Sequence, residues 1–483
     1  MYRVQPSLTH SLGASTFFSV GSQLMMLATT LLAIHCHFDL VWAESIQESP
    51  SSIIKSPKKI INAGPMVGFG GNKEVTLWLQ TTRTAKVYFK YWPIAEPSNV
   101  MLSPSVKTNA ESNHIAKITL SDLPSGQDFE YQVIINQTPQ TFTYPLRFQT
   151  VVRWQRRQPP PDFKMAIGSC AYFNLDSEDH YGGGYEIFEQ IRAQSPDLML
   201  WLGDNLYLGP EDWSSAEGIY RRYAKQRSHP SIQALLASVH HYAIWDDHDY
   251  GPNDANRSYP LKGVSLDAFK QFWANPNYGL PDHPGIFGTF SWSDVDFFLL
   301  DDRTYRAPGN APHSVDKPLL GQRQLQWLLD ALAASRATFK IIAVGSQVLN
   351  PFDRFEGYAQ HAQERDQLIK GLRSYGIEGV IFLSGDRHFS ELNKLDDDPA
   401  FYPLYDFTSS PLTSGVASSV SDEVNNPLRV KGTLVSTQRS FGMISISGQG
   451  TERKLNLSAL NAKGEELWNY VIRADELKVP TLP

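Results

Sequence analysis

Cysteine is the scarcest residue type in this sequence, with only Cys36 and Cys170 among 483 residues. Two thiols exclude both the disulfide framework of small secreted domains and a zinc site built from four thiolates. A surplus of positive charge is also lacking, since 43 Lys and Arg stand against 50 Asp and Glu. This balance argues against non-specific binding to nucleic acid. Aromatic residues make up 12% of the chain, which indicates a packed core and excludes a disordered protein.

Long hydrophobic runs are missing as well. The apolar stretch at residues 24–34 is shorter than the roughly 20 residues that a membrane-spanning helix needs. Val41-Trp42-Ala43 follows it and is typical of a signal-peptide cleavage site, so residues 1–43 are predicted to be a secretory signal peptide. An uncleaved membrane anchor is the alternative. With the leader removed, we expect a secreted, periplasmic or cell-surface protein without stable membrane insertion.

Removal of the leader would leave Cys170 as the single cysteine of the mature chain. It would then have no internal disulfide partner. Its remaining roles are an inert core thiol, a reactive thiol or a metal ligand.

Residues 64–155 show the alternation of apolar and polar residues that is typical of β-strands. Short series separated by turns predict an N-terminal β-sandwich domain, and the turn at residues 123–126 resembles one in fibronectin type III-like domains. A stiff proline-rich linker follows at residues 158–161. The apolar series are Val75-Leu77-Leu79, Val87-Phe89-Tyr91, Ala116-Ile118-Leu120 and Phe129-Tyr131-Val133.

Over residues 162–475, short apolar runs end in polar clusters and alternate with helical patterns. This order predicts an α/β catalytic domain whose site lies at the carboxyl ends of its strands. Strand-like alternation returns at residues 443–446 and 454–457, which are expected to complete a second sheet. The polar clusters lie at residues 168–170, 203–205, 246–249, 301–303, 345–347 and 384–388.

The side chains in these clusters are those of metal ligands rather than of a nucleophile triad. Asp204 is the expected bridging carboxylate, because its two oxygens can bind two cations. Tyr207 lies three residues further on, and a phenol with an ordinary pKa near 10 needs a strongly acidic cation such as Fe(III). A Cys170 thiolate also favours a transition metal. Each residue also has a structural alternative: Asp204 could be a turn carboxylate, Tyr207 an aromatic ring under a loop and Cys170 a buried core thiol.

The acidic run at residues 246–249 follows an apolar strand and would be costly to bury without cations. Asp247 is expected to bind a second metal. His248 is expected to donate a proton to a leaving oxygen or to hold a phosphoryl oxygen. Asn205 and Asn253 are candidates for binding a phosphoryl oxygen or a metal. The alternative for the acidic run is a solvated charged loop.

Asp386 and His388 would point the same way on an extended strand end, so they are expected to serve adjacent ions. Arg387 would point elsewhere and is expected to be structural. Arg303 has two equal interpretations: it binds phosphate or carboxylate of the substrate, or it forms a salt bridge with nearby Asp residues.

Taken in order, these segments resemble the alkaline phosphatase D family, within the calcineurin-like metallophosphoesterase superfamily. The resemblance covers roughly residues 160–415. It implies an α/β fold in which the N-terminal β-sandwich precedes a calcineurin-like αββα sandwich catalytic domain. The segments that carry it are Gly168-Ser169-Cys170, Gly203-Asp204-Asn205-Leu206-Tyr207, Trp245-Asp246-Asp247-His248-Asp249, Asp302-Arg303-Thr304-Tyr305-Arg306 and Gly385-Asp386-Arg387-His388.

The resemblance also implies the cofactors. One or two Ca(II) ions would lie beside Fe(III), held by Asp386 and by a residue of the loop at residues 247–253, and His248 would lie near the phosphate. A binuclear divalent metal centre is the alternative. The ligands implied for Fe(III) are Cys170, Asp204, Tyr207 and His388.

The activity implied is that of a secreted, metal-dependent phosphoric ester hydrolase, an alkaline phosphatase or phosphodiesterase that uses a metal-activated water. A phospholipase D-like phosphodiesterase acting on lipid or on a cell-wall polymer is a second interpretation. A non-catalytic exported binding protein is a third. The expected partner is a phosphate ester substrate, with no nucleic-acid binding beyond a substrate role.

Overall fold

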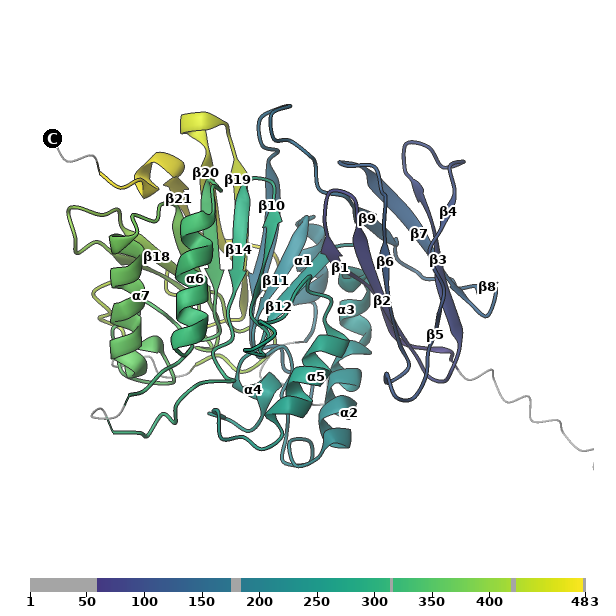
Figure 1. Ribbon diagram of the computed structural model, residues 1–483, viewed down its shortest axis with the longest axis horizontal. Helices are drawn as coiled ribbons and strands as arrows, with labels where there is room; N and C mark the ends of the chain where they lie inside the picture. Colours follow the sequence, from purple (N-terminus) through teal and green to yellow (C-terminus); the bar gives the residue numbers. More distant parts are fainter. Residues whose placement is uncertain (1–58, 175–183, 313–315, 418–422, 481–483) are drawn as a thin grey trace, which may run out of the picture. The chain divides into compact units, whose positions relative to one another are not determined.

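The computed structural model describes residues 59–174, 184–312, 316–417 and 423–480, which fall within one compact unit, Lys58–Pro483 (Figure 1). The predicted leader at residues 1–43 lies outside the described residues. In the part of the chain that is described, none of the helices combines the length and the hydrophobicity that a membrane span requires.

The first sheet has nine strands in the order β21-β20-β19-β10-β11-β12-β1-β2-β6. Its central strands β10, β11 and β12 run parallel, and β11 and β12 are buried at every position. Strands covered on both faces are predominantly apolar, which explains the apolar runs of the sequence here, although β12 begins with two buried histidines, His240 and His241. The bounds are β10 (Phe163–Gly168), β11 (Leu198–Leu202), β12 (His240–Ile244), β19 (Ser440–Ser447), β20 (Lys454–Asn461) and β21 (Glu466–Arg473).

The C-terminal strands differ from the prediction. The segments at residues 443–446 and 454–457 are strands, but they do not complete a second sheet. Instead β19 pairs antiparallel with β10 and continues the first sheet. Periodicity shows which face of a strand is buried but not which strand is its neighbour.

The second sheet has six strands in the order β13-β14-β15-β16-β18-β17. It packs against the first sheet through aromatic side chains. Tyr242 stacks on Phe290 with ring centroids 3.7 Å apart, and Phe407 meets Trp468 at 4.9 Å. The bounds are β13 (Gly288–Trp292), β14 (Val295–Leu299), β15 (Phe339–Ala343), β16 (Val380–Ser384), β17 (Glu391–Leu395) and β18 (Leu404–Thr408).

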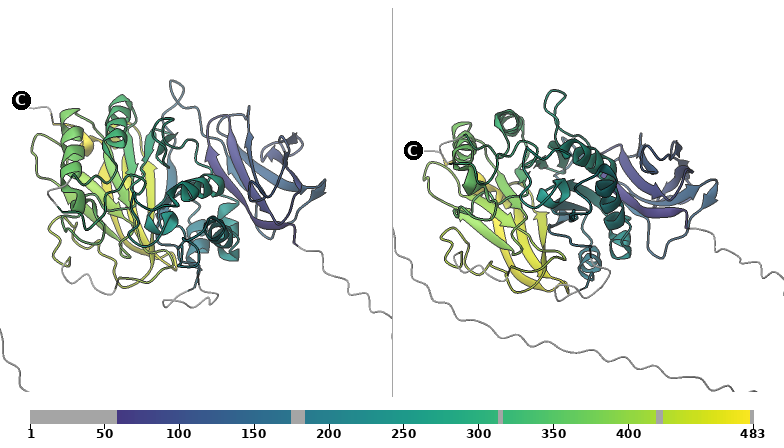
Figure 2. Two further views of the ribbon diagram at one scale, coloured as in Figure 1. Left: turned by 60° about the horizontal axis from the view of Figure 1, so that its bottom comes forward. Right: turned by 90° about the horizontal axis from the view of Figure 1, so that it is seen from below.

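Helices lie beside both sheets. Figures 1 and 2 show α6 and α7 side by side near the second sheet, with α2, α3 and α5 grouped near the first. The predicted helix at Leu325, Leu328, Leu329 and Leu332 is α6, and all four leucines are buried. The bounds are α1 (Ile187–Ala193), α2 (Ala216–Arg227), α3 (Pro230–Leu236), α4 (Asp247–Tyr250), α5 (Lys262–Phe272), α6 (Gln322–Ala334) and α7 (Ala362–Ser374).

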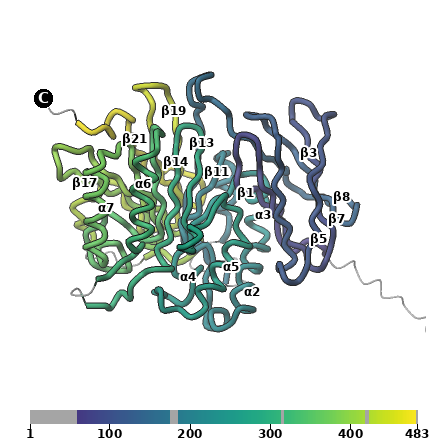
Figure 3. Tube along the Cα trace, viewed as in Figure 1, coloured from purple at the N-terminus to yellow at the C-terminus, as the bar shows by residue number. Residues whose placement is uncertain are grey.

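The N-terminal strands form two layers around a hydrophobic cluster of their own, which contains the four predicted apolar series. One layer is a separate sheet of β3, β4, β5, β7, β8 and β9, and the other is β1, β2 and β6. β1 lies next to α3 (Figure 3) and pairs with β12 at Val67 and His240, so this layer belongs to the nine-stranded sheet. The bounds are β1 (Ile61–Gly70), β2 (Val75–Thr81), β3 (Lys86–Pro93), β4 (Met101–Leu102), β5 (Val106–Lys107), β6 (Ile115–Leu120), β7 (Asp128–Ile135), β8 (Thr138–Pro139) and β9 (Arg147–Gln149).

Candidate metal centre at the strand ends

The predicted polar clusters meet where parallel strands of the two sheets end. Cys170 follows β10, Asp204 follows β11 and Asp247 follows β12, all in the first sheet. Asp386 and His388 follow β16 of the second sheet. A cavity of about 670 Å³ opens at this edge, and Asp204, Asp247, Asp386 and His388 line it.

One group of candidate ligands contains Cys170, Asp204 and His388, whose donor atoms all lie within 4.8 Å of one another. The Cys170 Sγ is 3.6 Å from Asp204 Oδ2. The Tyr207 hydroxyl lies 3.3 Å from the same Asp204 oxygen and 3.3 Å from His388 Nε2. The structure thus brings together the four residues implied to hold iron, in an arrangement that converges on one point.

A second group consists of Asp204, Asp247 and His248, again within 4.8 Å. Asp204 belongs to both groups, as a bridging carboxylate must. The backbone N–H of His248 donates to Asp204 Oδ1 at 3.3 Å, which leaves Oδ2 facing the first group. The His248 ring lies against that of Tyr207, with centroids 4.2 Å apart.

A third group, Asp247, Asp254 and Glu356, was missed by the sequence reasoning. Asp254 follows the acidic run closely, and its proximity in sequence was a usable indication. Glu356 belongs to none of the quoted motifs, so only the fold shows that it reaches the cavity. It lines the cavity together with Asp254.

Burial makes these acidic groups hard to ionise. Desolvation and the neighbouring Asp247 raise the pKa of Asp204 well above its usual range. Burial likewise raises the pKa of Tyr207, raises that of Asp386 to about 7 and, together with Asp386, raises that of Cys170 to about 11. These four acidic donors, whose charged forms would repel one another and Asp247 in a buried site, fit a cation that would stabilise the charged forms.

Asp247 is the exception. Burial alone would raise its pKa, but nearby His248 and Arg303, and the backbone N–H of Asp254, outweigh burial and lower the pKa below its usual value. The Asp254 N–H donates to Asp247 Oδ2 at 2.7 Å. Asp247 is therefore an anion ready to bind a cation.

The backbone at these ligands is unusual. Cys170, Asp204, Asp386 and His388 have φ values of 59°, 51°, 65° and 54°, in the left-handed region that residues with a Cβ rarely occupy. β16 ends at Ser384, so the expectation that Asp386 and His388 alternate on an extended strand is wrong. Both still reach the cavity, because the two left-handed turns replace the alternation. Such strain typically occurs at functional sites.

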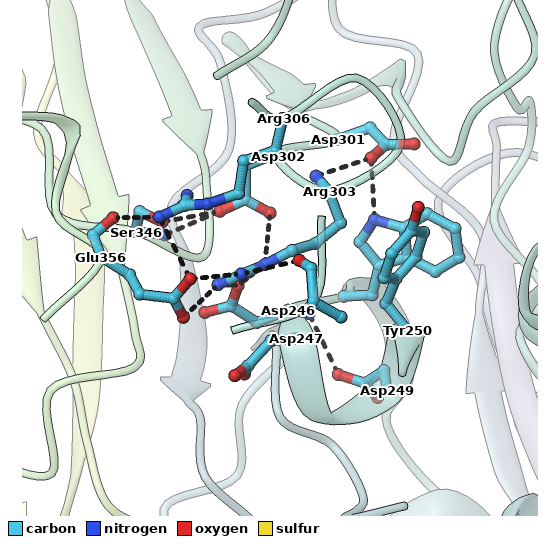
Figure 4. A network of polar contacts seen from close by, with 12 residues as sticks. Asp246, Asp247, Asp249, Tyr250, Asp301, Asp302, Arg303, Arg306, Ser346 and Glu356 are labelled. Carbon is cyan, nitrogen blue, oxygen red and sulfur yellow. Dashed lines mark hydrogen bonds and ion pairs between the residues drawn. The ribbon is translucent and has the colours of Figure 1, made fainter. Parts of the chain in front are cut away.

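The acidic run at residues 246–249 is not a solvated loop, since its three aspartates are buried. Asp249 accepts the backbone N–H groups of Asn205 and Asp246, each at 3.1 Å, and so ties the loop after β11 to the loop after β12. The Asp246 side chain does not line the cavity and points toward Arg303 instead (Figure 4).

Arg303 is fully buried and does not line the cavity. Its Nε donates to Asp246 Oδ1 at 2.5 Å, and its terminal nitrogens donate to the two carboxylate oxygens of Glu356 at 2.8 and 3.0 Å (Figure 4). With all of its donors directed at protein carboxylates and a carbonyl, the structure favours the salt-bridge interpretation over phosphate binding. The structural interpretation of Arg387 also holds, because it is buried and binds Glu423 at 2.7 Å.

The two candidate asparagines lie in different environments. Asn205 is buried, is absent from the cavity wall and donates its amide to the Ile244 carbonyl at 2.8 Å. It is therefore placed to hold the loop after β11. Asn253 lines the cavity beside His248, where a phosphoryl oxygen would be within reach of the wall.

The sequence model of a family described as PhoD-like phosphatase matches residues 165–457, more than half of the chain. The chain belongs to this family. The match covers the loops that carry Cys170, Asp204, Asp247 and His388.

Among curated proteins, a relative of this PhoD-like chain is alkaline phosphatase D of Bacillus subtilis (strain 168), with 26% identity over 310 residues. The alignment covers 53% of this chain and 51% of the relative, so the chain spans about half the length of the curated relative that it matches.

Two solved structures have a similar fold. One is described as the structure of PhoD, with a TM-score of 0.72 and 17% identity over 88% of this chain and 92% of the other. The other is the purple acid phosphatase PPD1 from yellow lupin seeds, with a TM-score of 0.59 and 12% identity over 87% and 77% of the two chains. At these identities the likeness shows the fold alone, which is one of mixed α/β sheets.

Proposed function

We propose that this chain is an exported, metal-dependent phosphoric ester hydrolase, an alkaline phosphatase or phosphodiesterase. The observation that supports this most is that one carboxylate, Asp204, belongs to two adjacent groups of candidate ligands at the edge of an accessible cavity. Two neighbouring cations are a common means of hydrolysing phosphate esters, because they can stabilise both the attacking and the leaving oxygen. Membership of a phosphatase family supports the same reaction.

The metals proposed are Fe(III) with one or two Ca(II) ions. A thiol, a phenol and an imidazole suit iron, and the carboxylates of Asp247 and Asp386 suit calcium. A binuclear divalent centre is the alternative. When bound, the metals would lower the pKa of a water molecule and neutralise phosphoryl oxygens. The proposed iron ligands are Cys170, Asp204, Tyr207 and His388.

Three of the chain's own side chains lie at this site. The hydroxyl of Ser410 donates to the Cys170 Sγ at 3.0 Å, which favours the thiolate. The Ser414 hydroxyl lies 3.3 Å from His388 Nε2 and would give up this contact when that nitrogen binds a metal. His248, on the cavity wall, is positioned to hold a phosphoryl oxygen or to donate a proton to the leaving oxygen.

The proposed architecture is the one expected from the sequence. Residues 64–155 would be a fibronectin type III-like β-sandwich, and residues 162–475 a calcineurin-like αββα catalytic domain. The two facing sheets with helices beside them support the catalytic architecture, and the separate N-terminal hydrophobic cluster supports the sandwich, although β1, β2 and β6 of that sandwich continue the nine-stranded sheet. Residues 1–43 would be removed on export.

The test is an assay of one aryl phosphate and one bis-aryl phosphate, each with added calcium and then with a chelator. Asp204→Asn should lower kcat/KM by about three orders of magnitude or more without changing the free energy of unfolding substantially, because it removes the shared ligand. Asp282→Asn removes an exposed carboxylate that pairs with Arg323 at 3.2 Å; it is the matched control and should leave kcat/KM unchanged.

Near-normal turnover in Asp204→Asn would refute the proposed site. Bound metal without turnover of either ester would favour the non-catalytic binding protein. A preference for the diester fits both a phosphodiesterase and the phospholipase D-like alternative, and hydrolysis of a phospholipid or of a cell-wall polymer would favour the latter.

A further inference from the structure

An aromatic side chain at the cavity has no role in the hydrolysis proposed above. Phe355 lines the same cavity as Asp386 and His388, yet 61% of its surface is exposed. Exposure of a phenyl ring forfeits the stabilisation that its burial would bring. A large apolar ring held in the open at the wall of a polar cavity is a typical contact for a ligand.

The backbone that presents this ring is strained and firmly anchored. Phe355 and Glu356 have φ values of 46° and 64°, which are unfavourable for an aromatic and for an acidic residue. Glu356 is fixed by Arg303 at 2.8 Å and by Arg306 at 3.2 Å, both of them buried (Figure 4). The buried ion pairs offset the strain and hold the ring in position.

One side of the Phe355 ring is already in contact with a cation. The Arg387 guanidinium carbon lies 5.2 Å from the Phe355 centroid and 4.9 Å from that of the buried Phe389. Arg387 is itself fixed by Glu423 and lies between the two cavity residues Asp386 and His388. The ring is thus a rigid surface attached to the loop that carries candidate ligands.

Besides Phe355, the cavity wall carries four amide side chains among its carboxylates. Gln360 has a buried Oε1 with no hydrogen-bond partner among the described residues. A flexible acyl chain would need several apolar side chains, whereas amides beside one aromatic ring suit a planar group with hydrogen-bonding edges. The amide residues on the wall are Asn253, Asn256, Asn310 and Gln360.

We propose that Phe355 is a stacking platform for a planar, hydrogen-bonding ring in the alcohol portion of the ester, so that the preferred substrates are nucleotide-type esters that carry a nucleobase. This inference rests on the proposed hydrolase activity and assigns its substrate class. Phe355 is a specificity residue and takes no part in the attack on phosphorus.

The experiment compares substrates that differ only in the base. Adenosine 5′-monophosphate is paired with ribose 5-phosphate, and their methyl diesters form a second pair for the case in which the enzyme prefers diesters. Since base stacking on an aromatic side chain changes binding by roughly ten- to a hundredfold, we expect kcat/KM to be about tenfold or more higher with the base. Phe355→Ala should bring this ratio of kcat/KM values close to one by raising KM for the base-bearing ester. The kcat/KM of the base-free ester should stay unchanged.

Two further variants separate stacking from simple apolar contact and from misfolding. Phe355→Trp should keep the preference, and Phe355→Leu should lose it. Tyr375→Ala removes another exposed aromatic, 53% exposed, and should change neither ester. A preference retained in Phe355→Leu, or a strong preference for octyl phosphate over the base-bearing ester, would overturn the proposal in favour of an apolar chain.

Failure of the proposed hydrolase activity and failure of the stacking platform give different results. If the wild type hydrolyses neither pair nor any aryl phosphate, the proposed hydrolase activity fails and the inference fails with it. If the wild type hydrolyses both members of a pair equally well, the stacking platform alone is refuted. Equal losses on both esters in Phe355→Ala would assign the residue a structural role and would also refute the platform.

Discussion

Arg303→Lys is the substitution that distinguishes most clearly between a structural and a substrate-binding arginine. The change keeps the positive charge but replaces a planar fork with a single ammonium group. The guanidinium now binds Asp246 through one edge and both oxygens of Glu356 through the other, and also donates to the Ala255 carbonyl at 3.3 Å. One ammonium cannot span two carboxylates on opposite edges.

The magnitude follows from the burial of these groups. Arg303 and Asp246 have fully buried side chains, and Glu356 is 13% exposed. Loss of two charge-assisted hydrogen bonds, each contributing about 1.5–3 kcal/mol, predicts a decrease of about 3 kcal/mol in the free energy of unfolding. This lies at the lower end of the roughly 3–5 kcal/mol that breaking a buried ion pair costs.

Urea denaturation of the metal-loaded protein measures the loss, and inhibition by inorganic phosphate measures any role in substrate binding. We expect the inhibition constant to change less than about threefold, since a residue outside the cavity should barely affect phosphate binding. Arg323→Lys is the control, because its pair with Asp282 is exposed and should be worth less than about 1 kcal/mol. A stability loss below about 1 kcal/mol in Arg303→Lys, or phosphate inhibition weakened tenfold in a stable protein, would refute the structural role.

Two further predictions concern a thiol and a histidine. Cys170→Ser should fold but retain well under half of the bound iron, because a buried hydroxyl does not ionise as a thiol does. It should also lose the visible absorption of a Tyr207–iron contact. Stoichiometric iron in this variant would contradict the proposed ligand. Burial lowers the pKa of His241 from 6.5 to about 3, and its Nδ1 accepts the Trp201 Nε1–H at 2.9 Å. The neutral ring therefore contributes fully to the free energy of unfolding above pH 6.5. This contribution is lost as the pH falls, and about 2 kcal/mol of it is gone at pH 5. His241→Gln should remove that part of the pH dependence of the free energy of unfolding, and an unchanged dependence would contradict it.

Much of the site could be predicted because a polar cluster directly after an apolar run marks the end of a buried strand in the sequence. A buried parallel strand is a continuous apolar run, and the residues after it must lie at the carboxyl edge of the sheet. Cys170, Asp204 and Asp247 follow three such runs, so their convergence follows from the fold class alone. The side-chain types then indicated a metal.

The rest depended on the tertiary structure. Whether Arg303 faces substrate or protein depends on Glu356, which is distant in sequence and belongs to no motif. The left-handed backbone at Asp386 and His388 has no sequence marker, because neither position is glycine. Phe355 is one of 25 phenylalanines, and only the fold shows that it is exposed at the cavity.

The pairing of β1 with β12 affects how this protein can be divided. β12 precedes Asp247 and pairs with β11 along one side. On its other edge β1 pairs with it at His240, and Asn275 binds the backbone N–H and C=O of Ala243 at 3.1 and 2.7 Å. An unpaired central strand with apolar faces is a template for intermolecular sheet formation. The N-terminal strands and Asn275 therefore close the edge of the strand beside the candidate metal centre together, and removal of the N-terminal strands should expose part of that edge.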